Sequence, residues 1–153
     1  MFDPSLFGRM SPDVLTSASP DVGAAVPAPT SSGAALLSPW PSGRHSLGLS
    51  EQRDTVLYVP PDLPTDTAVP LFVMFHGAGG FPEKVLPFIE PHAQRHKFLV
   101  LAPHSTFPTW DIVIGGNGPD LERLQSALRE VASRYRIDTG RVAFAGFSDG
   151  ASY

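Results

Sequence analysis

The stretch VPLFVMFHGAGG, residues 69–80, decides the fold, because a continuous apolar run ends there in a glycine-rich loop. An apolar run without polar alternation is expected for a strand that is buried on both faces of a parallel sheet. The stretches FLVLAP (98–103) and RVAFAGF (141–147) have the same character. Helix-like segments separate these runs. The order strand, helix, strand, helix, strand predicts an α/β fold with a mainly parallel sheet and right-handed crossover helices.

Two segments between the apolar runs carry helical signals. Apolar residues recur at steps of three and four along one face of residues 121–135: Leu121, Leu124, Leu128, Val131 and Tyr135. Pro119 and Asp120 precede this stripe, where a proline and a carboxylate favour a helix start. Residues 82–96 contain Pro87 and Pro91. We therefore expect a short helix there, or one that begins late with Pro91 in its first turn.

The first part of the chain differs from the rest in its composition and in the periodicity of its apolar residues. Residues 1–44 are rich in Pro, Ser and Ala and lack a sustained period, which predicts a flexible extension. Trp40 lies between two prolines in this part and receives no role. From residue 45 onward HSLGL and DTVLYVP alternate, which predicts a hairpin of two strands around residues 51–53. Residues 45–153 are thus interpreted as the domain.

Composition excludes several classes of function. A net charge of −4 provides no electrostatic footprint for nucleic acid, and the lack of cysteine excludes disulfides and thiolate metal sites. No apolar run approaches the roughly 18 residues of a membrane span. The N-terminus also lacks the features of a signal peptide, so we expect a cytoplasmic protein. His92 and His96 are four residues apart, but Pro91 and the missing glutamate between them argue against a zinc site.

The sequence GFSDG, residues 146–150, follows an apolar strand directly. A Gly-x-Ser-x-Gly pattern alone arises by chance in about one chain in ten of this composition, so its context matters. Here the context is a strand-to-helix turn, which places a serine in a strained conformation at the top of a sheet. Glycines two residues before and after Ser148 allow this turn to close. The motif predicts a nucleophilic serine.

The loop HGAGG, residues 76–80, follows another apolar strand. Acyl transfer needs two N–H donors aimed at the oxyanion, and the natural pair is the backbone N–H of Ala78 and that of Asp149. Glycine-rich loops also bind phosphate, but no Gly-Lys-Ser/Thr follows this one, and it lacks the dinucleotide-binding spacing. The loop therefore favours an oxyanion hole.

Taken together, the stretches RDTVLYVPP, PLFVMFHGAGG, FLVLAPHSTFPTWD and VAFAGFSDGASY resemble the α/β-hydrolase superfamily. The resemblance covers residues 47–153. Within the superfamily, the sequence resembles the bacterial phospholipase/carboxylesterase branch most specifically, and this branch is related to acyl-protein thioesterases. Its resemblance to polyhydroxyalkanoate depolymerase-type esterases is weaker. The superfamily resemblance implies Ser148 as nucleophile, and Ala78 and Asp149 as oxyanion donors. It also implies hydrolysis of a small-molecule or lipid ester, or of a thioester, without a metal or cofactor.

Other residues near these motifs have less settled roles. His76, together with Gly77 and Gly79, is expected to shape the oxyanion loop rather than to act as a base. Trp110 is either a wall of the acyl pocket or an aromatic plug over the sheet edge. His104 stands where relatives often carry Asp, and a loop position is favoured over a pocket position. Asp120 is favoured as a helix-start carboxylate over a triad acid.

The chain order in α/β-hydrolases is serine, then acid, then histidine, and this sequence ends five residues after Ser148. We therefore expect an N-terminal fragment of a serine hydrolase that is inactive by itself. Loss of a triad costs on the order of 10⁶ in kcat. The last apolar strand would be a bare sheet edge. The alternative is a non-catalytic pseudo-enzyme or interaction module of the same fold. The sequence leaves the oligomeric state and the acyl preference open.

Overall fold

The computed structural model describes residues 35–115 and 118–153. In chain order the elements are β1 (Gly43–Ser46), β2 (Val56–Val59), β3 (Val69–Phe75), α1 (Pro82–His96), β4 (Leu99–Ala102), the 3-10 helix η3 (Asp111–Ile114), α2 (Pro119–Ala132), β5 (Ile137–Gly146) and α3 (Asp149–Ser152). Across the described ranges, no helix combines the length and hydropathy that a bilayer crossing requires. The first 34 residues of the predicted extension lie outside the described part of the chain.

The described strands form one mixed sheet in the order β1-β2-β4-β3-β5. β1 and β2 pair antiparallel, which confirms the predicted hairpin, and β2 also pairs antiparallel with β4. β4, β3 and β5 are mutually parallel, as the three apolar runs predicted. Because parallel strands end at the same edge of a sheet, the loops after β3, β4 and β5 gather there.

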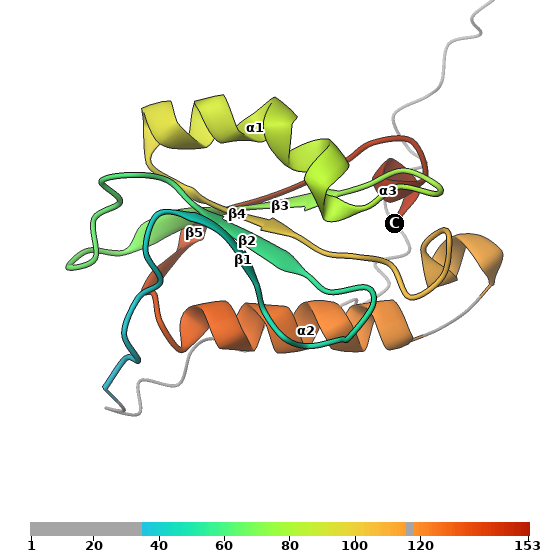
Figure 1. Ribbon diagram of the computed structural model, residues 1–153, viewed down its shortest axis with the longest axis horizontal. Helices are drawn as coiled ribbons and strands as arrows, with labels where there is room; N and C mark the ends of the chain where they lie inside the picture. Colours follow the sequence, from blue (N-terminus) through green and yellow to red (C-terminus); the bar gives the residue numbers. More distant parts are fainter. Residues whose placement is uncertain (1–34, 116–117) are drawn as a thin grey trace, which may run out of the picture. The chain divides into compact units, whose positions relative to one another are not determined.

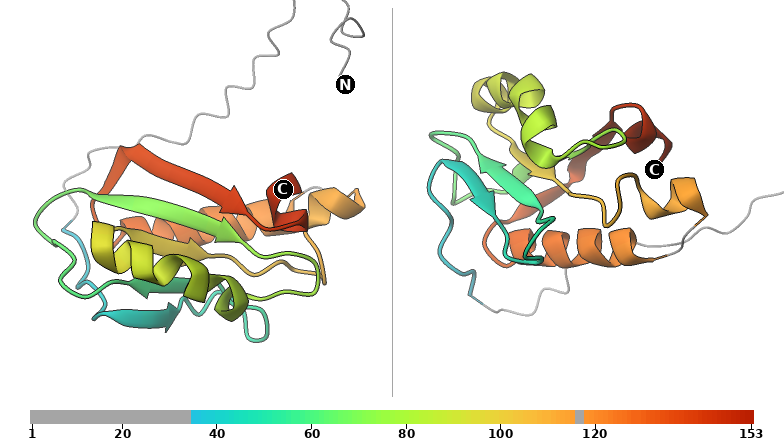
Figure 2. Two further views of the ribbon diagram at one scale, coloured as in Figure 1. Left: turned by 90° about the horizontal axis from the view of Figure 1, so that it is seen from above. Right: turned by 45° about the vertical axis from the view of Figure 1, so that its right-hand side comes forward.

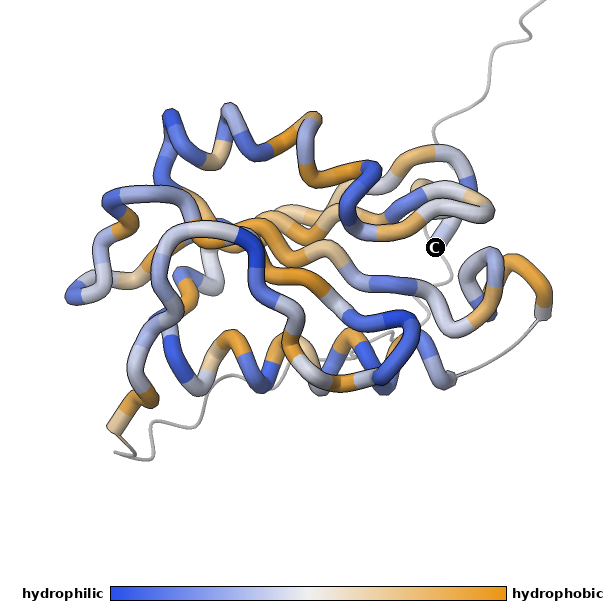
Figure 3. The backbone as a smooth tube through the Cα atoms, viewed as in Figure 1, coloured by the Kyte–Doolittle hydropathy of each residue, from blue (hydrophilic) through white to orange (hydrophobic). Residues whose placement is uncertain are grey.

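Helices α1 and α2 cover opposite faces of the sheet (Figure 1). Neighbouring residues of each buried strand point to opposite faces, so Leu57 belongs to the core under α2 and Val56 to the core under α1. The same division separates Leu101 from Val100 in β4. The buried strands β2, β3 and β4 are accordingly apolar along most of their length (Figure 3). Burial on two faces is the physical reason for the continuous apolar runs.

Helix α1 corrects one expectation, because it runs unbroken from Pro82 to His96 and is neither short nor late in starting. Pro82 occupies the start of the helix, while Pro87 and Pro91 lie inside it on the exposed face. A carbonyl that loses its N–H donor on that face remains accessible to water, which lowers the cost of each interior proline. Burial of Leu86 and Ala93 against the sheet then stabilises the whole length.

Helix α2 confirms its predicted start and its apolar stripe. It begins at Pro119, and Leu124, Val131 and the following Tyr135 are buried in the core. Leu121 departs from the expectation, because its side chain is 51% exposed at the end of the stripe. It lies instead beside an apolar depression on this face of the molecule.

Strand β5 forms an edge of the sheet, beside β3 (Figure 2). Its apolar stretch is not buried on both faces as the sequence pattern predicted, since Phe144 is 54% exposed. β3 is the only described strand that pairs with β5, and among the described helices neither α1 nor α2 packs closely over β5. This arrangement agrees with the bare sheet edge that the sequence predicted. Helix α3, which follows β5, is only four residues long.

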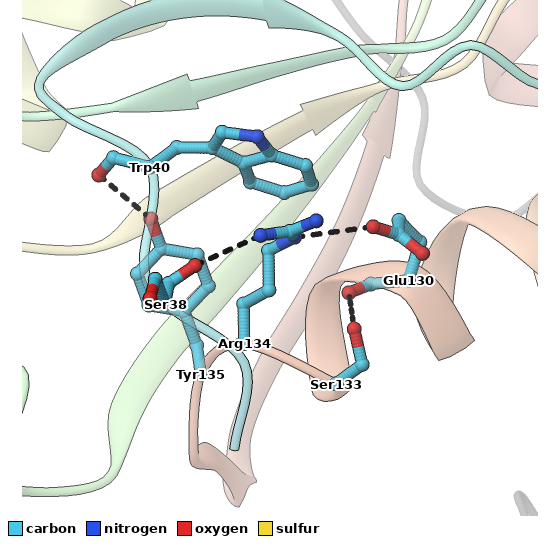
Figure 4. A network of polar contacts seen from close by, with 6 residues as sticks. All are labelled: Ser38, Trp40, Glu130, Ser133, Arg134 and Tyr135. Atoms are coloured by element: carbon cyan, nitrogen blue, oxygen red, sulfur yellow. Dashed lines mark hydrogen bonds and ion pairs between the residues drawn. The ribbon is translucent and has the colours of Figure 1, made fainter.

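Residues 35–44, which the sequence assigned to the extension, contact the domain through a polar network around Arg134 (Figure 4). The Arg134 guanidinium donates to the Ser38 carbonyl at 2.9 Å and to Glu130 at 3.1 Å. It also lies 4.1 Å from the centre of the Trp40 ring, in a cation–π arrangement. The Tyr135 hydroxyl donates to the Trp40 carbonyl at 3.1 Å. Trp40 therefore packs on the domain surface, which the sequence had left open without assigning the residue a role.

Candidate active site

Ser148 lies in the turn between β5 and α3 with backbone angles of φ 53° and ψ −118°. A positive φ is unfavourable for a residue with a Cβ atom, and such strain concentrates at functional sites. The turn exposes the serine side chain to solvent. The strained strand-to-helix turn that GFSDG predicted is therefore present at Ser148.

The two glycines around Ser148 are required by close backbone approaches. A Cβ atom on Gly146 would lie 2.0 Å from the Gly150 carbonyl oxygen. A Cβ atom on Gly150 would lie 2.5 Å from the His76 carbonyl oxygen and 2.6 Å from that of Phe75. Real Cβ atoms do not approach backbone so closely, so only glycine lets the turn pack against the end of β3.

The loop after β3 lies beside this turn because of the strand register. Phe75 is the partner of Gly146 in the parallel ladder, and the Phe147 N–H donates to the Phe75 carbonyl at 3.0 Å. A Cβ atom on Gly77 would contact Phe147 at 3.2 Å and the Ser148 Cβ at 3.3 Å. The structure thus brings the HGAGG loop and the serine turn together.

The Ala78 and Asp149 backbone N–H groups meet the first condition for oxyanion donors. Within the described ranges, neither N–H donates a hydrogen bond to another residue of the chain. By contrast, the Gly79 and Gly80 N–H groups of the same loop donate to the carbonyls of Pro108 and Gly77, at 2.6 Å and 2.9 Å. Two unengaged donors therefore remain on the segments that flank Ser148.

His76 is fully buried, and both of its ring nitrogens form hydrogen bonds with the backbone. Its Nε2 accepts the Ser105 N–H at 3.1 Å, so Nδ1 carries the proton and donates to the Gly77 carbonyl at 2.7 Å. Burial lowers the pKa of His76, and a nearby arginine, Arg53, lowers it further. A neutral imidazole that holds two loops has no free nitrogen with which to activate a serine. The role that the sequence favoured for His76, shaping the loop rather than acting as a base, stays a prediction.

Trp110 is buried against the end of β3, with 1% of the residue exposed. Its indole N–H donates to the His76 carbonyl at 2.8 Å. Its ring packs edge-on against Phe75 at 5.1 Å and beside Tyr153 at 4.8 Å. Burial raises the pKa of the Tyr153 hydroxyl to about 12. The two interpretations of Trp110 from the sequence, pocket wall and aromatic plug, both stay predictions.

Asp120 and Asp111 are buried carboxylates that hold the loop after β4. Asp120 accepts the N–H and the hydroxyl of Thr106 at 2.6 Å and 2.7 Å, and the Asp111 N–H at 2.8 Å. Asp111 accepts the N–H groups of Gly118 and Asp120 in return. Asp120 thus lies in the first turn of α2, but its carboxylate accepts from the loop before the helix, whereas Asp111 accepts the N–H groups at the helix start.

His104 lines a largely polar cleft of about 490 Å³ that residues 79 and 80 also border. Its ring stands edge-on to His76, with centres 5.3 Å apart. Burial, Arg53 and His76 together lower the pKa of His104 to about 4. The histidine is therefore neutral at pH 7. It lines a cleft, which was the less favoured of its two interpretations from the sequence.

The segment between His104 and Trp110 contacts both the HGAGG loop and the GFSDG turn, and sequence reasoning missed these contacts. The Pro108 carbonyl accepts the Gly79 N–H, and the Thr109 hydroxyl donates to the Asp149 carboxylate at 2.7 Å. The only sequence signal for these residues was their place after a buried parallel strand, where loops carry function. Their side-chain types gave no further indication.

The described histidines are engaged or distant from a catalytic constellation. His45 contacts the Pro41 carbonyl, and His92 and His96 are exposed on α1. In the described ranges, no histidine forms a hydrogen bond with Ser148, and no three acidic or histidine side chains gather as metal ligands do. The site therefore presents an exposed serine at positive φ and two unengaged backbone N–H groups, and no described histidine bonds to that serine.

Comparison with known proteins gives a result for structure only. No family model matches the sequence, and no curated protein matches it. A solved thermostable esterase is 26% identical to the chain with a TM-score of 0.52, over 63% of this chain and 31% of that one. An acetyl xylan esterase from Aspergillus awamori is 22% identical with a TM-score of 0.50, over 63% and 38%. The matches span about a third of the length of these esterases.

Proposed function

The chain carries the N-terminal portion of an α/β-hydrolase fold, and on this premise we propose that Ser148 is the nucleophile of a carboxylic ester or thioester hydrolase. The observation that carries the proposal is the backbone of Ser148, at φ 53° and ψ −118°, in a turn packed against the glycine loop. A chance Gly-x-Ser-x-Gly sequence has no reason to adopt this strained turn beside two unengaged N–H donors.

In the proposed mechanism, the Ser148 hydroxyl attacks the carbonyl carbon of the substrate and forms a tetrahedral intermediate. The Ala78 and Asp149 N–H groups stabilise the negative oxygen of that intermediate. Expulsion of the alcohol or thiol leaves an acyl-enzyme on Ser148, which water then hydrolyses. No step in this sequence calls for a metal or cofactor.

The serine needs a base, and we propose that a histidine and an acid from residues beyond this sequence supply it. His76 is bound on both nitrogens, and Asp120 and Asp111 accept backbone hydrogen bonds. The esterases that the chain matches are about three times as long as the matched part. Without its base Ser148 stays a neutral alcohol, so we expect the 153-residue chain alone to be inactive.

The test uses the protein encoded by the complete gene, including any codons that follow Tyr153. We expect it to hydrolyse p-nitrophenyl esters and to react with a fluorophosphonate probe, and Ser148→Ala should abolish both. Ser152→Ala is the matched control, because it removes an exposed serine four residues away in α3. Equal labelling of wild type and Ser148→Ala contradicts the nucleophile assignment.

Substrate choice within this class follows the resemblance to the phospholipase/carboxylesterase branch. We propose a cytoplasmic enzyme for small or lipid-derived acyl groups, related in activity to acyl-protein thioesterases. Comparison of p-nitrophenyl acetate with long-chain acyl esters and acyl thioesters measures this preference. A protein that hydrolyses none of them, while still reacting with the fluorophosphonate probe, contradicts this substrate class.

A second candidate function is a non-catalytic module that pairs through the β5 edge. It is favoured by one observation: Phe144 and Phe147 are 54% and 68% exposed beside this edge. Unpaired strand edges with apolar side chains recruit further strands. In this case the 153-residue chain should self-associate, and Phe144→Lys should return it to a monomer in sedimentation velocity. A wild type that stays monomeric at high concentration contradicts this candidate.

A further inference from the structure

We propose that Thr109 is a positioning residue for the oxyanion hole, acting through the carboxylate of Asp149. The inference rests on the proposed function and adds to it a residue with a specific task. The Thr109 Oγ1 donates to the Asp149 Oδ2 at 2.7 Å, and both side chains are half-buried. In this proposal Thr109 does not touch the substrate. It acts through Asp149, whose backbone N–H is one of the two proposed oxyanion donors.

The direction of the Asp149 N–H depends on few contacts of its own. Asp149 follows the strained Ser148 and is the first residue of α3, a helix of four residues. The first N–H groups of a helix have no partner inside it. A strained backbone conformation at positive φ persists only when the surrounding structure stabilises it. The hydrogen bond from the Thr109 hydroxyl provides such stabilisation, from a segment 40 residues earlier in the chain.

The neighbouring residue contacts the other half of the oxyanion hole. The Pro108 carbonyl accepts the Gly79 N–H at 2.6 Å, directly after Ala78 in the chain. Residues 108 and 109 therefore bond to both donor-bearing segments, one through a main-chain carbonyl and one through a side-chain hydroxyl. This pair of contacts fixes the spacing between the two oxyanion N–H groups.

The bonding segment is itself anchored at both ends. On one side the Ser105 N–H donates to the His76 Nε2, and Thr106 is held by Asp120. On the other side the Trp110 indole donates to the His76 carbonyl. A short segment that is hydrogen-bonded at both ends moves little, so the Thr109 hydroxyl can hold the Asp149 carboxylate in one position. Catalytic groups need placement to about 0.5 Å, which makes such a fixed support valuable.

The kinetic test uses the active gene product with Thr109→Val, which keeps the shape and removes the hydroxyl. We expect kcat to fall about 10- to 100-fold with KM within about twofold, because donor placement acts on the transition state. Thr109→Ser restores the hydroxyl and should recover most of kcat. Thr139→Val makes the same chemical change at an exposed position of β5 and should have no effect. A normal kcat in Thr109→Val overturns the inference.

A double-mutant comparison tests whether Thr109 acts through Asp149. If it does, adding Thr109→Val to Asp149→Ala should lower kcat no further than Asp149→Ala alone. Fully multiplicative losses overturn the proposed route. The melting temperatures of the single variants separate this effect from unfolding. If Thr109→Ser matches Thr109→Val in kcat, the hydroxyl is irrelevant and the inference is wrong.

A readout without catalysis distinguishes this inference from the proposed function. In ¹H–¹⁵N spectra of the 153-residue chain, Thr109→Val should shift the Asp149 amide resonance, while Thr139→Val should leave it in place. An unmoved Asp149 resonance overturns the inference whatever the activity. A protein with the expected shift but no activity, in which Ser148→Ala changes nothing, contradicts the proposed function while the Thr109–Asp149 bond stands.

Discussion

The Nε2 atom of His76 accepts the backbone N–H of Ser105 at 3.1 Å, which joins the loop after β3 to the loop after β4. The same ring donates to the Gly77 carbonyl, so one neutral histidine fixes two of the loops at the catalytic edge. Both ring nitrogens are therefore engaged, and neither is free to accept a proton from Ser148. Loss of the ring would release both loops at once.

Replacement of His76 by alanine should destabilise the domain by about 3–5 kcal/mol, because it opens a cavity and leaves a buried donor and acceptor unpaired. His92→Ala is the control, since His92 is exposed on α1 and its loss should cost less than about 0.5 kcal/mol. Urea unfolding of both variants measures the difference. Similar midpoints for the two variants would mean that the His76 contacts carry no stability.

Gly150→Ala should lower the free energy of unfolding by about 2 kcal/mol or more, because the added Cβ would lie 2.5 Å from the His76 carbonyl oxygen. Gly140→Ala provides the comparison, since its Cβ would meet only the flexible Asp138 side chain, at 3.3 Å. Thermal and urea unfolding check the prediction. A Gly150→Ala protein as stable as Gly140→Ala would show that the turn closes without this contact.

Asp120→Ala should destabilise the domain by about 2–4 kcal/mol, because three donors from Thr106 and Asp111 lose their acceptor in a buried site. Asp120→Asn retains one carbonyl oxygen and should fall between the alanine variant and wild type. Asp66→Ala removes an exposed carboxylate and should be close to neutral. The order of the three unfolding midpoints is the measurement, and an Asp120→Ala midpoint equal to that of Asp66→Ala contradicts the assignment.

The low pKa of His104, about 4, predicts a loss of stability in mild acid. The unfolded chain binds a proton near the ordinary pKa of 6.5, whereas folded His104 does so only near 4. The unfolded state therefore holds more protons between these values, and the folded state loses stability as the pH falls from 6.5 to 4. The lowered pKa of His76 acts in the same direction.

Urea unfolding at pH 7, 5.5 and 4.5 measures this effect. His104→Gln cannot titrate and should show a smaller decrease across the window than wild type. His92→Gln, on the exposed face of α1, should leave the decrease unchanged. Equal pH slopes in wild type and His104→Gln would show that His104 is not the group responsible.

Several features of the fold could be predicted because they depend on local patterns of apolar residues in the sequence. Buried strands need apolar residues on both faces, so the runs that became β3 and β4 were evident without tertiary information. The stripe of α2 followed from the helical period. Helix α1 was mispredicted because local propensity penalises Pro87 and Pro91, while packing of Leu86 and Ala93 outweighs that penalty.

The sequence by itself determined the tight turn at Ser148, because a serine at positive φ between close-packed backbones requires glycine on both sides. It also determined the parallel strands that bring HGAGG and GFSDG to one edge. Only the tertiary structure decided the tautomer of His76, the burial of Trp110 and the bond from Thr109 to Asp149. These join residues 29 to 40 positions apart, and no local pattern of residue types encodes which distant donor meets which acceptor.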